Sequence, residues 1–130
     1  MKKVFVLGSI NLDFVISVDK LPLIGESRNG HNFMTNQGGK GANQAIACKK
    51  LGCEYVSLIA SIGNDDNGVI LKRAIDKYGV DTSSIIVKND VSSGCCVIVL
   101  DETVKDNILI IDRGANDAIK KAFFSFSKIL

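Results

Sequence analysis

The sequence predicts an α/β fold: an incomplete Rossmann-like parallel sheet with flanking helices, and a small second β-sheet beside it. Three observations lead to this prediction. Short apolar runs typical of buried strands alternate with segments of helical periodicity. Two further segments have the character of hairpins. The chain has 130 residues, of which 46% are hydrophobic and 23% charged, so it is long and apolar enough to enclose a core.

The predicted strands occur before, between and after the helical segments. In order, they are residues 4–7, 14–18, 30–37, 55–62, 85–87, 95–100 and 108–111. The runs at 4–7 and 55–62 are apolar and unbroken by charge, which is typical of strands buried on both faces of a parallel sheet. The polar run 30–37 predicts a short exposed strand, and the charged residues 101–107 predict a hairpin tip.

Three helices are predicted from their end signals and apolar faces. The first opens at the glycine cluster 38–41 and ends before Gly52, with basic residues in its last turn. One of the polar residues 65–67 caps the second helix and Gly79 ends it, while Asn116 caps the third. The apolar faces of the second and third helices comprise Leu71, Ala74, Ile75 and Tyr78, and Ile119, Ala122, Phe123 and Phe126.

Strands that alternate with helices predict a parallel layer, and here that layer has only three strands. Such a sheet keeps an open apolar edge, and residues 125–130 stop where a further buried strand is expected. We therefore expect an unfinished architecture and an oligomer that covers the exposed surface.

Composition and charge exclude several classes of function. The net charge is +2, the charges are evenly spread and tryptophan is absent, so we expect no nucleic-acid partner. No apolar run reaches the ~20 residues of a membrane span, so we expect no membrane partner.

The four cysteines, at positions 48, 53, 95 and 96, match no zinc or redox motif. His31 stands alone and could supply at most one further metal ligand. We therefore expect free thiols packed as small apolar groups, no metal site, and a cytoplasmic location.

The first candidate site is residues 8–13 (GSINLD), directly after the first strand. Ligands of open α/β sheets bind beyond the carboxyl ends of the strands. Asn11 offers two donors and an acceptor, and an ionised Asp13 only accepts, so the two could hold neighbouring hydroxyls of a polyol. The alternative is a turn in which both side chains bond local backbone.

The second candidate site is residues 38–45 (GGKGANQA). Its glycines allow close approach of a ligand, and the helix start offers free N–H groups and positive potential. It is not a P-loop, because Lys40 is not followed by Ser or Thr. It is not a dinucleotide fingerprint, because Gln44 stands where Gly or Ala is required. A purely structural role of the glycines stays open.

Taken together, these motifs resemble the N-terminal portion of the ribokinase-like (phosphofructokinase B) family of sugar kinases. The resemblance covers essentially all 130 residues, and the string at 39–45 is specific to the ribokinase branch. The matching strings are, in order, residues 8–13, 25–26, 38–45, 63–68, 79–82 and 113–116.

The resemblance implies a truncated ribokinase-like fold and assigns a role to several residues. The α/β core would comprise about 1–13, 38–93 and 112–130, and the segments about 14–37 and 94–111 would form a β-lid that also pairs with the lid of a second subunit. The residues implied to bind the sugar hydroxyls are Asn11, Asp13, Gly39, Lys40 and Asn43, and those implied as apolar lid contacts are Cys96 and Ile111.

The implied reaction is transfer of the γ-phosphoryl group of ATP to the 5-hydroxyl of D-ribose, with Mg²⁺ and K⁺ as further cofactors of the full-length family member. The family's base and anion hole lie in a Gly-Ala-Gly-Asp motif, which these 130 residues do not contain. None of the fourteen acidic residues is assigned as the base. We therefore expect the chain alone to be inactive and to bind none of the three cofactors securely.

Two further classes of function stay open. The chain could be a non-catalytic sugar-binding or dimerisation module derived from a ribokinase. It could also be a sugar-responsive regulator that uses half of the fold. Ribose is not distinguished from deoxyribose or another pentose.

Overall fold

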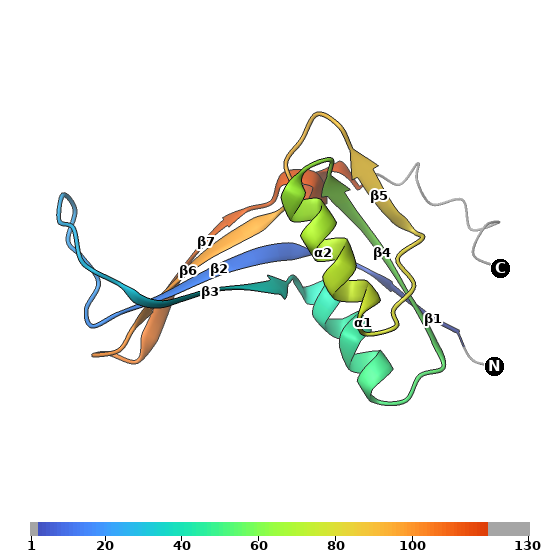
Figure 1. The fold of residues 1–130 in the computed structure, drawn as a ribbon, viewed down its shortest axis with the longest axis horizontal. Coiled ribbons are helices and arrows are strands. Elements are labelled where there is room, and N and C mark those ends of the chain that lie inside the picture. Colours follow the sequence, from blue (N-terminus) through green and yellow to red (C-terminus); the bar gives the residue numbers. More distant parts are fainter. Residues whose placement is uncertain (1–2, 120–130) are drawn as a thin grey trace.

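The computed structural model describes residues 3–119, which form two sheets, two α-helices and one 3-10 turn (Figure 1). The elements are β1 (Lys3–Leu7), β2 (Asn11–Val18), β3 (His31–Gly38), α1 (Lys40–Lys50), β4 (Tyr55–Gly63), α2 (Asp66–Asp76), β5 (Ile85–Lys88), β6 (Cys95–Asp101), β7 (Asp106–Asp112) and η1 (Gly114–Ala118). Their order confirms the predicted α/β class.

The first sheet has three parallel strands in the order β1-β4-β5. In its register Lys3 pairs with Tyr55 and Ala60 with Ile85. Both helices lie on one face of this sheet (Figure 1). The parallel layer with flanking helices is therefore confirmed.

The core lies between this sheet and the two helices. Leu58 from β4, and Leu71 and Ile75 from α2, are fully buried. Burial of each such side chain stabilises the fold by roughly 1.5–3 kcal/mol. From α1 the core receives small residues, Ala42 and Ala45, which let this helix approach the sheet closely.

Strand β1 differs from the prediction of burial on both faces. Val4 and Val6 pack on the core, but Phe5 and Leu7 are 37% and 55% exposed. Both α-helices pack on the Val4 face, so neither of them covers Phe5 and Leu7 on the other face. The apolar run of β1 alone does not show whether a second layer covers both of its faces or only one.

The second sheet has four strands in the order β3-β2-β6-β7 and projects from the core as a long arm (Figure 1). Its β2–β6 pair is parallel, and the β2–β3 and β6–β7 pairs are antiparallel. The predicted second sheet is thus confirmed, although β2 begins at Asn11 rather than at residue 14. We call this sheet the arm.

The end of the described chain corrects one prediction. Asn116 does not cap a helix: it lies within η1, and Ile119 directly after it is extended. The remaining residues of the predicted third helix, including Ala122, Phe123 and Phe126, lie outside the described residues. Neither α-helix in the described range has the length and apolarity needed to cross a bilayer.

Candidate functional site

A hollow of about 400 Å³ lies where the end of β1, the start of α1 and the arm meet. All the residues predicted as ligand contacts line it: Asn11, Asp13, Gly39, Lys40, Asn43, Cys96 and Ile111. The sequence analysis did not predict the other lining residues, which are Ser9, Ile98, Leu109, Arg113 and Asn116. The structure therefore brings the two candidate motifs together at one site, and their role in binding stays a prediction.

The hollow is built on a close crossing of two backbone segments. A Cβ on Gly41 would lie 2.6 Å from the carbonyl carbon of Gly8, and a Cβ on Gly8 would lie 2.8 Å from the Cα of Gly41. Gly39 has a φ of +92°, and a Cβ there would approach the carbonyl oxygen of Ser9 to 2.6 Å. These glycines are required by the crossing, so their structural role is real even where a ligand also binds.

Ser9 satisfies the first amides of α1. Its Oγ accepts a hydrogen bond from the Lys40 amide at 3.1 Å, and its carbonyl accepts one from the Ala42 amide at 3.1 Å. The prediction that the helix start presents free N–H groups to a ligand is therefore wrong for these two amides. Ser9 thus holds the first turn of α1 against the turn that follows β1.

Asp13 lies on β2 with its carboxylate against Gly38, where any Cβ would collide with it. No donor within residues 3–119 forms a hydrogen bond or ion pair with this carboxylate. Burial raises the pKa of Asp13 above its ordinary value. The alternative in which this side chain is bound to local backbone is therefore excluded by the structure.

The orientation of the Asn11 amide follows from its contact with Asn116. The Ile10 amide donates to Asn116 Oδ1 at 3.0 Å, so Asn116 Nδ2 must point the other way. That nitrogen donates to Ile10 O at 3.1 Å and to Asn11 Oδ1 at 2.8 Å. Because Asn11 accepts with its oxygen, its Nδ2 remains without a partner in the described range and is available to the hollow.

Asn116 is thus the most informative residue that the sequence analysis placed wrongly. A Cβ at Gly94 would collide with its amide and would lie 2.5 Å from Asn11 Oδ1, so Gly94 makes room for this pair. The usable signal is a polar side chain in the short segment that follows the last strand of the arm. Helical periodicity downstream of it favoured the cap instead.

The lining of the hollow combines polar side chains with an apolar row. Asn11, Asp13, Lys40 and Asn43, from β2 and α1, provide polar groups. Next to Asp13 in the same sheet, β6 and β7 carry an apolar row that comprises Cys96, Ile98, Leu109 and Ile111. Burial, with smaller effects of the charges at Asp13 and Cys95, raises the pKa of Cys96, so its thiol is an apolar neighbour rather than a nucleophile. Such a site suits a small polyhydroxylated molecule.

Comparison with known proteins identifies relatives that are carbohydrate kinases. Residues 1–129 match the pfkB family carbohydrate kinases. The ribokinase of Bacillus subtilis is 37% identical over 123 residues, which is 95% of this chain and 41% of that protein. The chain thus spans about two fifths of the length of this curated relative.

Solved structures of ribokinases have the same fold. The ribokinase of Thermotoga maritima aligns with a TM-score of 0.87 at 31% identity, over 98% of this chain and 42% of that one. The ribokinase of Arabidopsis thaliana, complexed with ribose and ATP, aligns with a TM-score of 0.78 at 32% identity, over 88% of this chain and 36% of that one.

Replacement of Asn116 by alanine should lower the free energy of unfolding by about 1–3 kcal/mol, because it leaves the Ile10 amide and carbonyl without partners. Urea denaturation measures this. The matched control is Asp117→Ala, which removes only the exposed ion pair with Arg113 and should change stability by less than about 0.5 kcal/mol. Equal losses in the two variants would contradict the bracing role of Asn116.

Replacement of Asp13 by asparagine should stabilise the fold at neutral pH. Burial raises the pKa of Asp13 in the folded state above its value in the unfolded state. The folded state is therefore favoured by this group at low pH, and that contribution to stability is lost as the pH rises through the folded-state pKa. Asparagine does not titrate, so the advantage of the variant should grow from about pH 4 to about pH 7. Urea denaturation across this range measures it, with Asp90→Asn as the control for loss of one exposed negative charge. An advantage that shrinks with rising pH would contradict the assignment.

Proposed function

Since the chain belongs to the pfkB family of carbohydrate kinases, we propose that it supplies the sugar-binding part of a ribokinase-type enzyme. That enzyme would transfer the γ-phosphoryl group of ATP to the 5-hydroxyl of D-ribose. The observation that carries the proposal is the pair Asn11 and Asp13. Both side chains line the hollow, and each has polar atoms without a protein partner in residues 3–119.

In the proposed complex, Asp13 and Asn11 make different hydrogen bonds to the sugar. The Asp13 carboxylate accepts from two neighbouring hydroxyls, and the Asn11 Nδ2 donates to a hydroxyl oxygen. The exposed side chains of Lys40 and Asn43 complete the polar side from the first turn of α1. Cys96 and Ile111 contact the carbon face of the sugar from the arm. The arm is then the lid of the site.

The proposal gives this chain no catalytic base. Among the described residues, Asp13 is the only carboxylate that lines the hollow, and it is assigned to the sugar. Mg²⁺ is usually held by carboxylates together with substrate phosphates. A hollow with one carboxylate does not fit the Mg²⁺ and K⁺ that the resemblance implies, and we assign neither these ions nor ATP to the described residues. The alternative function, a non-catalytic sugar-binding or dimerisation module, uses the same hollow.

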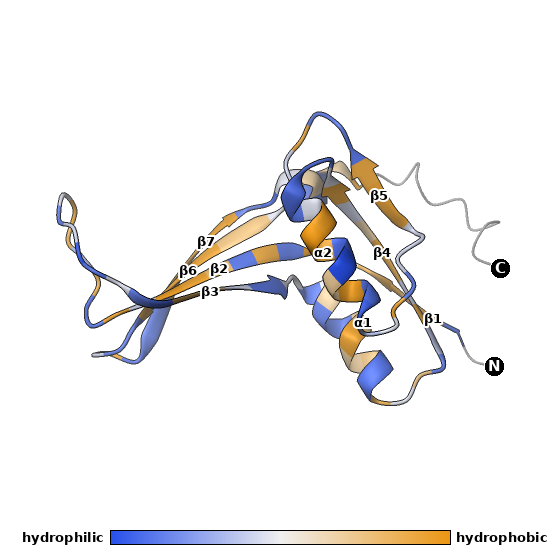
Figure 2. Ribbon diagram, in the orientation of Figure 1, coloured by the Kyte–Doolittle hydropathy of each residue, from blue (hydrophilic) through white to orange (hydrophobic). Residues whose placement is uncertain are grey.

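The proposal includes a homo-oligomer formed through the arm. Side chains of β7 alternate, so Leu109 and Ile111 line the hollow while Ile108 and Ile110 face the opposite side. There they line a second, largely apolar groove of about 340 Å³. Ile110 is 65% exposed, and apolar residues continue along β6 of the arm (Figure 2). A second copy of the arm would cover this face.

The proposed location is the cytoplasm. All four cysteines are free, although Cys95 and Cys96 are adjacent in β6. Reduced thiols are typical of a compartment that keeps glutathione reduced.

Titration calorimetry with D-ribose tests the sugar site. The unmodified chain should show saturable binding, and Asp13→Ala should weaken it by roughly 10- to 100-fold, because hydrogen bonds to a charged group contribute about 1.5–3 kcal/mol. Asp90→Ala, at an exposed loop position, is the control and should bind like the parent. If the parent chain and Asp13→Ala gave the same heats of binding on titration with D-ribose, the assignment of Asp13 to the sugar site would be contradicted.

Light scattering at roughly 100 μM tests the arm interface, because weak associations are populated at this concentration. The unmodified chain should be a dimer or larger. Ile110→Glu places a charge on the apolar face and should give a monomer, since a buried unpaired charge is costly. Leu51→Glu is the control: Leu51 is 85% exposed at the end of α1, outside both grooves. A monomeric parent chain would exclude this interface.

A further inference from the structure

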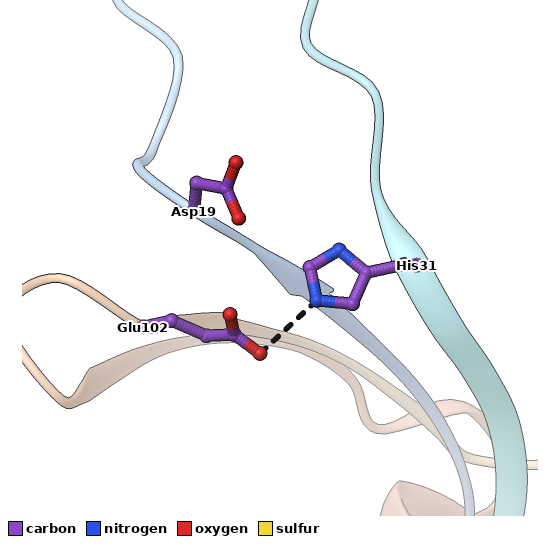
Figure 3. Close-up of side chains that lie close together, drawn as sticks. All are labelled: Asp19, His31 and Glu102. Atoms are coloured by element: carbon purple, nitrogen blue, oxygen red, sulfur yellow. Dashed lines mark hydrogen bonds and ion pairs between the residues drawn. The ribbon is translucent and has the colours of Figure 1, made fainter.

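The far end of the arm carries a cluster of potential metal ligands, Asp19, His31 and Glu102 (Figure 3). We propose that this cluster, which we call the tip site, binds one divalent transition ion of the Zn²⁺ class. The tip site is separate from the hollow: β2 begins at the hollow with Asn11 and ends one residue before Asp19. On β6, Ile98 lines the hollow and lies four residues before Glu102, which separates the two sites by roughly 13 Å at roughly 3.3 Å per residue.

The donor atoms are already gathered. One ligand atom of each residue lies within 4.8 Å of the other two, and His31 Nε2 lies 3.0 Å from Glu102 Oε1. Zn²⁺ bonds to imidazole and carboxylate are about 2.0–2.2 Å long, which places neighbouring donors of a tetrahedral site roughly 3.3 Å apart. Side-chain rotations that move the donor atoms by about 1 Å are therefore sufficient to bring all three within bonding distance of one ion.

The backbone that carries these side chains is held by the sheet rather than by a free loop. His31 pairs with Ser17 across β2 and β3. The Glu102 amide donates to Val18 O at 3.0 Å, and the Thr103 amide donates to Asp19 O at 3.1 Å. The three ligands therefore come from three strand ends whose separation is set by main-chain bonds. Such preorganisation reduces the conformational entropy that an ion would have to overcome.

The charge of the cluster also favours a cation. Neither Asp19 nor Glu102 forms an ion pair with a lysine or arginine in the part of the chain that the structure describes. With a neutral imidazole, the tip site carries two negative charges on its exposed surface. An imidazole nitrogen together with carboxylate oxygens suits Zn²⁺ and its neighbours, whereas Mg²⁺ and Ca²⁺ prefer oxygen ligands throughout. Three protein ligands leave the fourth position for water.

An ion at the tip site would join the two ends of the loop that follows β2. Asp19 precedes this loop and His31 follows it, and the loop includes the fully exposed Ile24. A ligand that binds only the folded state stabilises that state by mass action. An ion at the tip site would therefore hold the two ends of this loop together. The proposal does not depend on sugar binding at the hollow.

Titration of the metal-free chain with ZnCl₂ in a calorimeter tests the proposal. We expect one site with a dissociation constant on the order of micromolar, at least tenfold weaker binding for His31→Ala and Glu102→Gln, and no comparable site for MgCl₂. The control is Asp90→Asn, which removes an exposed carboxylate outside the arm and should leave the affinity unchanged.

Zinc can also bind free thiols, so a second measurement identifies the ligand. Two-dimensional NMR of the imidazole should show shifts of the single histidine on addition of ZnCl₂ at one equivalent. Zn²⁺ binding that is the same in the parent chain and in His31→Ala would show an ion on the cysteines or on scattered carboxylates and would overturn the proposal. Absence of binding, or an unshifted imidazole, would do the same.

Discussion

The rest of the structure depends on the close backbone contact between the turn after β1 and the first turn of α1. Gly8 and Gly41 lie so near that a Cβ on either would collide with the other segment. Ser9 then binds the Lys40 and Ala42 amides, which locks the helix start onto the turn. Because β2 leaves directly from this turn, the contact determines where Asn11 and Asp13 lie relative to α1. Without it, the two motifs would belong to separate surfaces.

A second constraint joins the arm to this crossing and explains the polarity of the hollow. Asn116, just after the last strand of the arm, binds both main-chain groups of Ile10 and the side chain of Asn11. Asn11 is thereby braced, whereas Asp13 has a raised pKa and no partner among the described residues. A half-buried carboxylate without donors costs folding energy. Retaining such a group is expected where a ligand supplies the missing donors.

Local patterns in the sequence were sufficient to predict the order of the strands and α-helices and the two motifs that meet at the hollow. The family resemblance, not a local pattern, added Lys40, Asn43, Cys96 and Ile111 as contacts, and Ser9 was missed. Local patterns failed where the outcome depends on a partner distant in the chain. The apolar run of β1 predicted burial on both faces, yet Phe5 and Leu7 are exposed because both helices pack on the other face. Asn116 looked like a helix cap because its true partner is 106 residues away in the chain. His31 looked isolated because strand pairing, not spacing, brings Glu102 to it.

The arm shapes the hollow, because its strands β2, β6 and β7 supply half of the lining residues. Its inner face contributes the apolar row from Cys96 to Ile111, and these side chains move together because β6 and β7 are paired along their whole length. The polar groups come from β2 of the same sheet and from the first turn of α1, which the glycine crossing brings close together. Because β2 is paired with β6 from Leu12 to Val18, a movement of the arm relative to α1 would carry Asp13 together with the apolar row. In the proposed complex, the position of the arm would therefore set both where the Asp13 carboxylate meets the sugar and how much apolar surface of the sugar is buried.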